Sequence, residues 1–349
     1  MGTFQHKTKT VTNRARLSCV VVAFSACLAA VGSASAQGPN SVTPAAHKSA
    51  ARPTHVDFDE PGGITEHVIL VSIDGLRPDA IDEFEAPTLQ RLIESGSHSL
   101  WASTIVPSKT LPSHTSMLTG VGPDVHGIEW NSYAPDRLGY VEVPTIFELA
   151  HEAGLTTAAF VAKAKFRHLL DPSEVDYFEV PQTNATTWTA TRTAERATNY
   201  LRHERPNLMF VHLGEPDFAG HTIGWMTQAY GWAVRQADGA VARLIEAADA
   251  TYGPGGYMLI VTADHGGHAR THGSAATEDR RIPWIAYGAG VRTRTELLPG
   301  IRTMDTAATV LWALGVEVPE TWAGRPVLSA FLPSRDEPVA AALDTTAGN

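Results

Sequence analysis

The sequence predicts a single α/β domain of three layers, in which a mostly parallel central sheet is covered by helices on both faces. Short apolar runs alternate along the chain with longer segments of helical spacing, which is typical of parallel strands joined by crossover helices. The chain between residues 64 and 333 is long enough for one large core and shows no internal repeat. Polar side chains of metal-binding type follow several of the apolar runs, at the sheet edge where such folds place their active sites.

Five apolar runs are expected to form the strands. Each is short and rich in aliphatic residues, as in strands that are buried by helices on both faces. In chain order they are residues 67–73, 156–161, 207–213, 257–262 and 282–287.

Five longer segments between and after these runs carry the apolar period of a helix. Asp305 is placed to cap the N-terminus of the last one. In chain order they are residues 86–94, 145–153, 187–203, 227–248 and 305–314.

Residues 1–36 have the pattern of an export signal. Basic side chains precede an apolar segment at 17–32, which is followed by the small-residue site Ala34-Ser35-Ala36. The apolar segment is shorter than the roughly 20 residues that a membrane-spanning helix needs. We therefore expect cleavage near Ala36, a periplasmic or secreted protein, and no stable membrane partner.

The segments on either side of the expected domain at 64–333 are expected to be a flexible linker, residues 37–63, and a flexible tail, residues 334–349. Both are rich in Ala, Pro and Ser and lack an apolar period. Both cysteines, Cys19 and Cys27, lie within residues 1–36, so the exported chain would have no disulfide. Lipidation at Cys27 is an open alternative, because the residues before it loosely resemble a lipoprotein cleavage site.

The charge of the chain argues against a nucleic-acid partner. The formal net charge is −10 at pH 7, and residues 1–36 hold basic but no acidic side chains, so the exported chain is more acidic still. An acidic chain lacks the basic groove that phosphate backbones require. We therefore expect no nucleic-acid groove and a small-molecule substrate.

The first candidate site segment is a buried run that ends at Asp74, where Gly75 allows a sharp turn. An acid at this sheet edge faces the crevice where active sites form. Taken alone, Asp74 also fits a turn or helix-capping aspartate.

The second segment places Thr110 just before Pro112 and an apolar helical turn. The free N–H groups and partial positive charge of a helix N-terminus suit a phosphate and favour an ionised hydroxyl. A free threonine hydroxyl is a weak nucleophile, so a catalytic Thr110 requires a metal or a base, and a capping role is the alternative.

The third and fourth segments supply the other candidates. Asp217 and His221 are four residues apart after an apolar run, so one helical turn would bring both to one metal ion. A second apolar run ends at Asp264 and His265, and His272 follows them, with His268 as its competitor. Three carboxylates and three imidazoles match the mixed ligands that zinc accepts, whereas magnesium and calcium prefer oxygen.

These segments resemble motifs of the alkaline phosphatase superfamily and are most similar to those of the nucleotide pyrophosphatase/phosphodiesterase family. The segments are S-I-D-G, K-T-x-P-x-H, E-P-D-x-x-G-H, D-H-G and T-H-G, in the order of the family, over roughly residues 66–332. The resemblance implies an alkaline-phosphatase-like three-layer sandwich.

The resemblance also implies two Zn²⁺ ions per chain and a role for each candidate. One zinc would be held by Asp217, His221 and His272, and the other by Asp74, Asp264, His265 and the Thr110 oxygen. Thr110, in K-T-x-P, would be the nucleophile and would form a phosphoryl-threonine intermediate. Asn131, in H-G-I-E-W-N, and helix-start N–H groups would donate to phosphoryl oxygens.

The implied function is that of an exported two-zinc phosphohydrolase. The favoured activity is that of a phosphodiesterase or nucleotide pyrophosphatase acting on a small phosphate ester or nucleotide. A phosphomonoesterase is one alternative, with extra positive donors offered by Lys109, Lys163, Lys165 and Arg167. A phosphonate hydrolase and a non-catalytic metal-binding protein are the others. A sulfatase is disfavoured, because no cysteine of the exported chain is available as its modified nucleophile.

Overall fold

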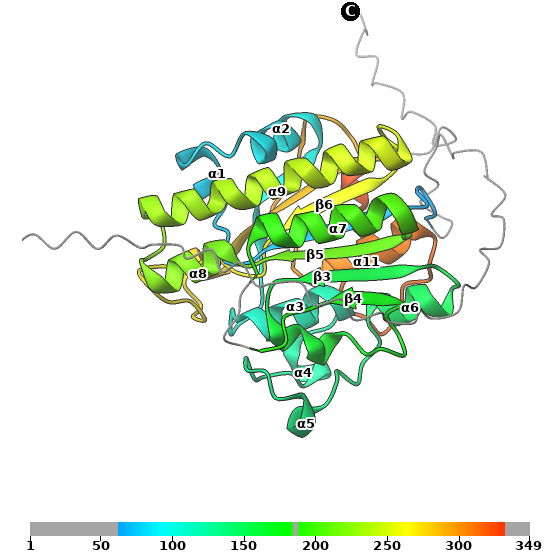
Figure 1. Ribbon diagram of the computed structural model, residues 1–349, viewed down its shortest axis with the longest axis horizontal. Coiled ribbons are helices and arrows are strands. Elements are labelled where there is room, and N and C mark those ends of the chain that lie inside the picture. Colours follow the sequence, from blue (N-terminus) through cyan, green and yellow to red (C-terminus); the bar gives the residue numbers. More distant parts are fainter. Residues whose placement is uncertain (1–61, 184–187, 332–349) are drawn as a thin grey trace, which may run out of the picture. The chain divides into compact units, whose positions relative to one another are not determined.

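The computed structural model of the protein describes residues 62–183 and 188–331 (Figure 1). The expected export signal, the lipidation alternative at Cys27, nearly all of the expected linker and the expected tail lie outside these residues. Among the helices of the described part of the chain, none combines the length and apolar character needed to cross a bilayer.

The centre of the fold is an eight-stranded sheet with the order β4-β3-β5-β1-β6-β7-β2-β8. The strands are β1 (Val68–Ile73), β2 (Ser97–Ser103), β3 (Thr157–Val161), β4 (Tyr177–Glu179), β5 (Leu208–Leu213), β6 (Met258–Thr262), β7 (Arg281–Gly288) and β8 (Thr295–Glu296). The five expected strands are confirmed as β1, β3, β5, β6 and β7. The expectation of a mostly parallel sheet is confirmed, although β7 runs antiparallel to both of its neighbours, β6 and β2.

Parallel pairing brings the C-terminal ends of β1, β5 and β6 to one edge of the sheet. Ile73 pairs with Leu213, and Ser72 pairs with Thr262. All three strands are fully buried. The polar residues that follow them therefore emerge side by side from a rigid apolar base.

Two sets of helices cover the sheet, and the strands lie between them (Figure 1). In one set, α9 (Gln228–Tyr252) packs against α1 (Ala80–Glu83), α2 (Pro87–Ser95), α7 (Ala190–Glu204) and α8 (Glu215–Thr222). In the other, α3 (Thr110–Thr119) packs against α4 (Pro123–His126), α6 (Ile146–Glu152) and α11 (Asp305–Leu314). Short helices in the connections are α5 (Pro135–Leu138), η1 (Ala164–Leu169), α10 (Thr277–Arg280) and η2 (Leu328–Ala330). The expected three layers are confirmed.

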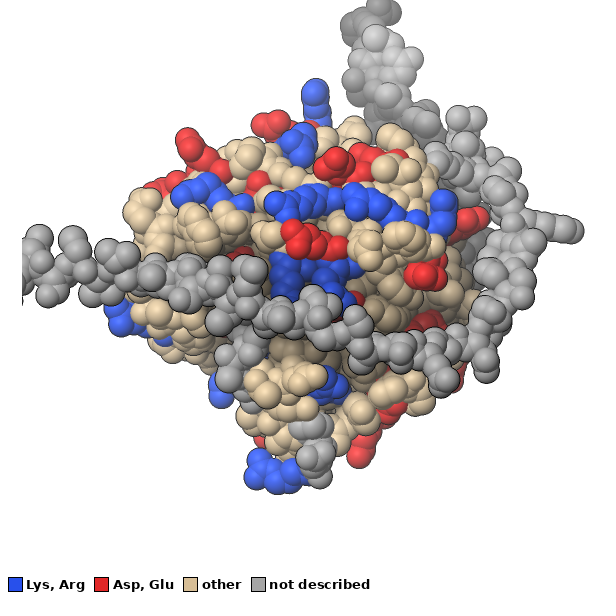
Figure 2. Space-filling model, in the orientation of Figure 1, with Lys and Arg blue, Asp and Glu red and all other residues tan. Residues whose placement is uncertain are grey.

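The outer face of the first helix set carries charges of both signs. Figure 2 shows Lys and Arg side chains in a band over α7 and α9, with acidic side chains among them. Arg196 of α7 pairs with Glu179, and Arg243 of α9 lies 3.6 Å from Glu195. These helices are amphipathic, with alanines and leucines packed inward and solvated charges outward.

One expected cap is wrong. Asp305 is the first residue of α11, and Met304 is its N-cap. The Asp305 carboxylate instead accepts from the backbone N–H groups of Arg302 and Arg325, at 2.8 and 3.0 Å. The acid thus joins two loops at the start of the helix, because both loops present donors to it.

Helix α3 is buried along its entire length. Two of its hydroxyl side chains are satisfied within the helix: Thr115 donates to the Leu111 carbonyl at 2.8 Å, and Thr119 to the Thr115 carbonyl at 2.7 Å. The helix therefore forms a rigid base for Thr110, its first residue.

Candidate active site

The turn after β1 brings three carboxylates together. Gly75 has a φ of +74°, and a Cβ at this position would lie 2.9 Å from the Asp217 Cα, so only glycine lets α8 approach so closely. The Asp217 N–H donates to the Asp74 carbonyl at 3.0 Å. The Gly75 N–H donates to Asp264 Oδ1 at 3.1 Å. Backbone contacts therefore fix the mutual positions of the three acids.

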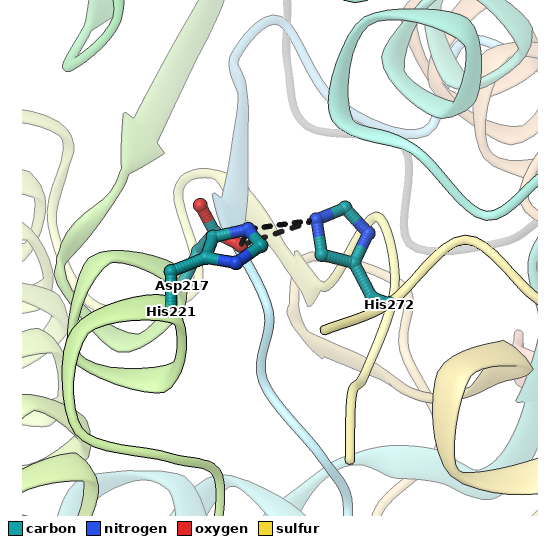
Figure 3. Close-up of side chains that lie close together, drawn as sticks. All are labelled: Asp217, His221 and His272. Atoms are coloured by element: carbon teal, nitrogen blue, oxygen red, sulfur yellow. Dashed lines mark hydrogen bonds and ion pairs between the residues drawn. The ribbon is translucent and has the colours of Figure 1, made fainter. Parts of the chain in front are cut away.

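Asp217, His221 and His272 form the first group of candidate metal ligands (Figure 3). One ligand atom from each lies within 4.8 Å of the others. Asp217 and His221 project from the same turn of α8, and His221 Nε2 is 3.3 Å from Asp217 Oδ1. His272 reaches them from a separate loop, with its Nε2 atom 3.1 Å from His221 Nε2 and 3.6 Å from Asp217 Oδ1.

The backbone determines which nitrogen of each imidazole carries the proton. The Nδ1 atoms of His221, His265 and His272 face the carbonyls of Arg270, Gly266 and Ser108, at 3.1, 2.7 and 2.7 Å. A carbonyl only accepts, so each Nδ1–H donates and each neutral ring is left with a lone pair on Nε2. Two such lone pairs 3.1 Å apart, on His221 and His272, repel unless a cation lies between them.

The second group joins Asp74, Asp217 and His265, again within 4.8 Å. His265 Nε2 is 3.4 Å from Asp74 Oδ1 and 3.9 Å from Asp217 Oδ1. Asp264, expected in this set, lies beside it, with its Oδ2 atom 3.2 Å from His265 Nε2. Asp217 thus belongs to both groups, an arrangement that the linear spacing does not indicate.

The carboxylates carry more negative charge than the neighbouring side chains balance. Lys163 Nζ lies 2.7 Å from Asp74 Oδ2 and 2.5 Å from Asp217 Oδ2. Burial would raise the pKa of both acids, but Lys163 helps to hold each below its usual range. Burial, followed by the charge of Asp74, raises the pKa of Asp264 well above its usual range. One ammonium group does not neutralise three buried acids, so the site favours additional cations.

Four buried side-chain atoms of the site have no hydrogen-bond partner among the described residues and are atoms that a metal ion would use. They are Asp74 Oδ1, Asp217 Oδ1, Asp264 Oδ2 and His265 Nε2. Buried polar atoms are rarely left without a partner. Their mixture of carboxylate oxygen and imidazole nitrogen fits zinc and similar transition metal ions.

Thr110 and Asn131 lie next to this cluster. Thr110 is buried at the start of α3, and His272 donates to the carbonyl of Ser108, two residues before it. Asn131 Oδ1 accepts from the Leu111 N–H at 2.9 Å. Helix-start N–H groups were expected to donate to a phosphate, but this one is already engaged. Lys165 Nζ also donates to Asn131 Oδ1 at 3.1 Å, which leaves the Asn131 amide N–H groups as its outward donors.

Two lysines bring positive charge to the site from η1 and the residue before it. Lys163 bridges two of the acids, as described above, and Lys165 contacts Asn131. Burial, together with the charge of Lys163, lowers the pKa of Lys165 to about 8.

The other histidines near the cluster have different partners. His268 bonds through Nδ1 to buried Asp279 at 2.7 Å and is in neither ligand group. Asp279 also accepts from the backbone and side chain of Ser274, so it fixes the loop that carries His272. His126 accepts from the Ile128 N–H and contacts Ser116, so its ring nitrogens are engaged within the fold.

Trp225 and Tyr230 support the turn after β1, a role that the sequence does not indicate. Trp225 Nε1–H and Tyr230 O–H donate to the Gly75 carbonyl at 3.0 and 2.9 Å. The Trp225 ring also meets the rings of His221 and His272 edge to face. These contacts link positions far apart in the chain, so only the fold reveals them.

Comparison with known proteins assigns the chain to a family. The family model for type I phosphodiesterase / nucleotide pyrophosphatase matches residues 68–278. Mouse ectonucleotide pyrophosphatase/phosphodiesterase family member 3 is 25% identical over 221 residues, 59% of this chain and 25% of that protein. GPI ethanolamine phosphate transferase 1 of Gibberella zeae is 23% identical over 309 residues, 76% of this chain and 30% of that protein. The chain spans 25–30% of the length of these curated relatives.

Solved structures show the same fold at low sequence identity. Murine ectonucleotide pyrophosphatase / phosphodiesterase 5 superposes with a TM-score of 0.65 at 16% identity, covering 76% of this chain and 100% of that one. A 2-O GAG sulfatase superposes with a TM-score of 0.60 at 16% identity, covering 76% of this chain and 74% of that one. These likenesses establish the alkaline-phosphatase-like fold. With the family match over more than half of its length, the chain belongs to the type I phosphodiesterase / nucleotide pyrophosphatase family.

Proposed function

We propose that this protein is a metal-dependent phosphoric ester hydrolase, a phosphodiesterase or nucleotide pyrophosphatase, that uses Thr110 as its nucleophile. The observation that carries the proposal is the convergence of Nε2 lone pairs and buried carboxylate oxygens beside the segment that starts α3. Such a set binds cations strongly and is poorly satisfied without them.

Two Zn²⁺ ions are the cofactors that this proposal assigns, one to each ligand group. The ligands would be Asp74, Asp217, His221, Asp264, His265 and His272, with the Thr110 oxygen. When bound, the metal ions supply Lewis acidity and lower the pKa of a hydroxyl or water.

The chain's own residues position and carry out the transfer. Thr110 Oγ1 loses its proton and forms a bond to phosphorus as the bond from phosphorus to the leaving ester oxygen breaks. This step gives a phosphoryl-threonine, and the leaving oxygen takes up a proton from solvent. Water then attacks phosphorus, the bond to Thr110 Oγ1 breaks, and a proton of that water passes to Thr110 Oγ1. Asn131, whose Oδ1 is already engaged by two donors, offers amide N–H groups to a non-bridging oxygen.

A nucleotide or similar small phosphate ester is the substrate class we propose. One structure of murine ectonucleotide pyrophosphatase / phosphodiesterase 5, in an inactive form with a threonine changed to alanine, contains AMP. A related protein, 26% identical over 57% of this chain, is the venom phosphodiesterase of Macrovipera lebetinus. With the leader pattern of residues 1–36, we propose export to the periplasm or medium and a catalytic domain at 64–333.

A phosphomonoesterase is the second candidate, because two lysines reach the site. Lys163 and Lys165 could neutralise the additional charge of a terminal phosphate, which a diester lacks. A non-catalytic metal-binding protein is disfavoured, because the chain has both Thr110 and the complete set of candidate ligands.

The test compares kcat/KM of the zinc-loaded protein on bis-p-nitrophenyl phosphate, p-nitrophenyl phosphate and p-nitrophenyl phenylphosphonate. We expect preference for the diester, and loss of turnover when zinc is chelated. If the protein prefers the monoester, and if this preference decreases in Lys165→Met, the assignment would change to a phosphomonoesterase. If it prefers p-nitrophenyl phenylphosphonate, the assignment would change to a phosphonate hydrolase. No metal-dependent turnover of any of the three would contradict the proposal.

A further inference from the structure

His212 is a polar side chain in a strand that is otherwise apolar. All six residues of β5 are buried, and the other five are Leu208, Met209, Phe210, Val211 and Leu213. An imidazole in such a position costs free energy unless both ring nitrogens are hydrogen-bonded. The partners of this ring therefore show why it can be retained there.

Both ring nitrogens of His212 are engaged, and their partners fix its tautomer. The Ala162 N–H points at Nδ1 at 3.2 Å, so Nδ1 is an acceptor and carries no proton. Nε2 therefore carries the proton and donates to Asp74 Oδ2 at 2.8 Å. This is the reverse of His221, His265 and His272, whose backbone partners protonate Nδ1.

The His212 ring has little freedom to leave this position. The ring of Phe166 lies 4.3 Å from it and that of His114 lies 5.0 Å away, measured between centroids. His114 is itself held between the Thr110 carbonyl and Ser72 Oγ, both at 2.8 Å. His212 is therefore a fixed donor, whereas Lys163, the other donor to Asp74 Oδ2, is a long side chain with four rotatable bonds.

Because His212 donates to Asp74 Oδ2, the two oxygens of Asp74 have different roles. Oδ2 accepts from His212 and Lys163, while Oδ1 has no hydrogen-bond partner among the described residues and faces His265 Nε2 at 3.4 Å. A carboxylate held through one oxygen presents the other in one orientation, which raises its affinity for a cation.

We propose that His212 is a positioning residue that donates Nε2–H to Asp74 Oδ2 and so directs Asp74 Oδ1 to a metal ion. The inference rests on the proposed metal-dependent function and adds to it a residue outside the expected ligand set. Its role is exerted through Asp74, and it touches no substrate.

The test compares His212→Gln with His212→Met in the full-length protein. Glutamine can place an amide N–H near the position of Nε2, whereas methionine has a similar volume and no donor. Zinc affinity is measured by competition with a chromophoric chelator, without substrate. We expect His212→Met to weaken zinc binding by about 10–100-fold, the range for loss of a ligand's hydrogen-bond partner. His212→Gln should retain most of the affinity at a similar Tm. Equal zinc affinity in the methionine variant and the wild type, or equal losses in both variants, would overturn the inference.

A second measurement needs no variant. Nitrogen chemical shifts of the imidazoles in the wild-type protein report which ring nitrogen of His212 is protonated, and Nδ1–H would overturn the inference even if both variants failed to fold. Failure of the proposed function is distinguishable: a wild type that binds no zinc would overturn both proposals. A wild type that binds zinc and hydrolyses the diester, with His212→Met unchanged in affinity, would overturn the positioning role alone.

Discussion

The imidazoles of the candidate site are prepared for a cation before one binds. His221, His265 and His272 each donate Nδ1–H to a backbone carbonyl, so their lone pairs already point inward. Burial lowers the pKa of His265, and burial, followed by the neighbouring His265, lowers that of His272 to about 4. Two of the three rings are thus neutral near pH 7, and metal binding there needs little protein reorganisation.

His221 differs, and this difference predicts how metal affinity depends on pH. The Asp217 carboxylate, 3.3 Å from His221 Nε2, raises the pKa of His221. Nε2 of His221 therefore stays protonated up to a higher pH than in an ordinary histidine. As pH falls through that raised pKa, zinc must displace a proton, and the affinity of this group decreases, by up to about tenfold per pH unit for one proton. Competition titrations with a chelator between about pH 8 and about pH 5 measure this slope. A His221→Ala variant that keeps the same slope would contradict the role of His221 as the titrating ligand.

The turn between β1 and α1 is the element on which the site depends most. Its peptide at Gly75 donates to Asp264 and accepts from Trp225 and Tyr230, so one turn is joined to three other segments. The positive φ and the contact with Asp217 leave no room for a side chain. The turn therefore fixes the positions of the candidate ligands relative to the edge of the sheet.

Gly75→Ala tests this element, with Gly127→Ala as a matched control. Both glycines have a positive φ, +74° and +69°, but a Cβ at Gly127 would meet nothing within 4 Å. Both variants should lose stability through backbone strain of about 1–2 kcal/mol. Gly75→Ala alone should also lose zinc affinity, because the Cβ displaces Asp217. Urea unfolding and zinc titration measure the two effects separately, and equal zinc affinities in the two variants would refute the role of the turn.

The periodic elements were predictable from the sequence, while the irregular ones were not. β1, β5 and β6 are apolar throughout, because both faces are covered, and such runs are evident without a structure. β2 is half polar and only partly buried, and β4 and β8 have three and two residues, so none carries a clear pattern. The direction of β7 depends on its pairing with β6 and β2, which no local signal encodes.

The candidate site was predictable to the extent that it is local. The four-residue spacing of Asp217 and His221 is a property of one helix, and the sequence reveals it. The approach of Lys163 to Asp74 and the sharing of Asp217 between two groups depend on strand order in the sheet. The order of the motifs indicates which residues belong to the site, whereas the contacts between them are evident only from the fold.

The molecule as a whole is acidic and concentrates part of this charge in its interior. Asp74, Asp217 and Asp264 are buried at one sheet edge in a chain whose formal net charge is −10. Their mutual repulsion opposes folding, and it is relieved by any cation that binds the folded state alone. Metal binding and folding are therefore expected to be coupled.

Chelation should lower thermal stability. A ligand present at about 1,000 times its Kd stabilises the folded state by about 4 kcal/mol, and a domain of this size shifts by about 2–4 °C per kcal/mol, so Tm should fall by roughly 8–16 °C on zinc removal. Differential scanning calorimetry measures the shift, and chelator already saturated with zinc is the control. An unchanged Tm would show that zinc does not bind the folded protein with useful affinity.

The proposed reaction depends above all on Thr110 as the nucleophile, and kcat/KM on bis-p-nitrophenyl phosphate for two zinc-loaded variants tests this role most directly. Thr110→Val keeps the shape of the side chain and removes the hydroxyl, whereas Thr110→Ser keeps a hydroxyl. We predict that the valine variant loses about a thousandfold or more, on the order of 4 kcal/mol of transition-state stabilisation, while the serine variant retains measurable turnover. A valine variant within about tenfold of the wild type, where tenfold is about 1.4 kcal/mol, would contradict the nucleophilic role of Thr110, since valine cannot form a covalent phosphoryl intermediate.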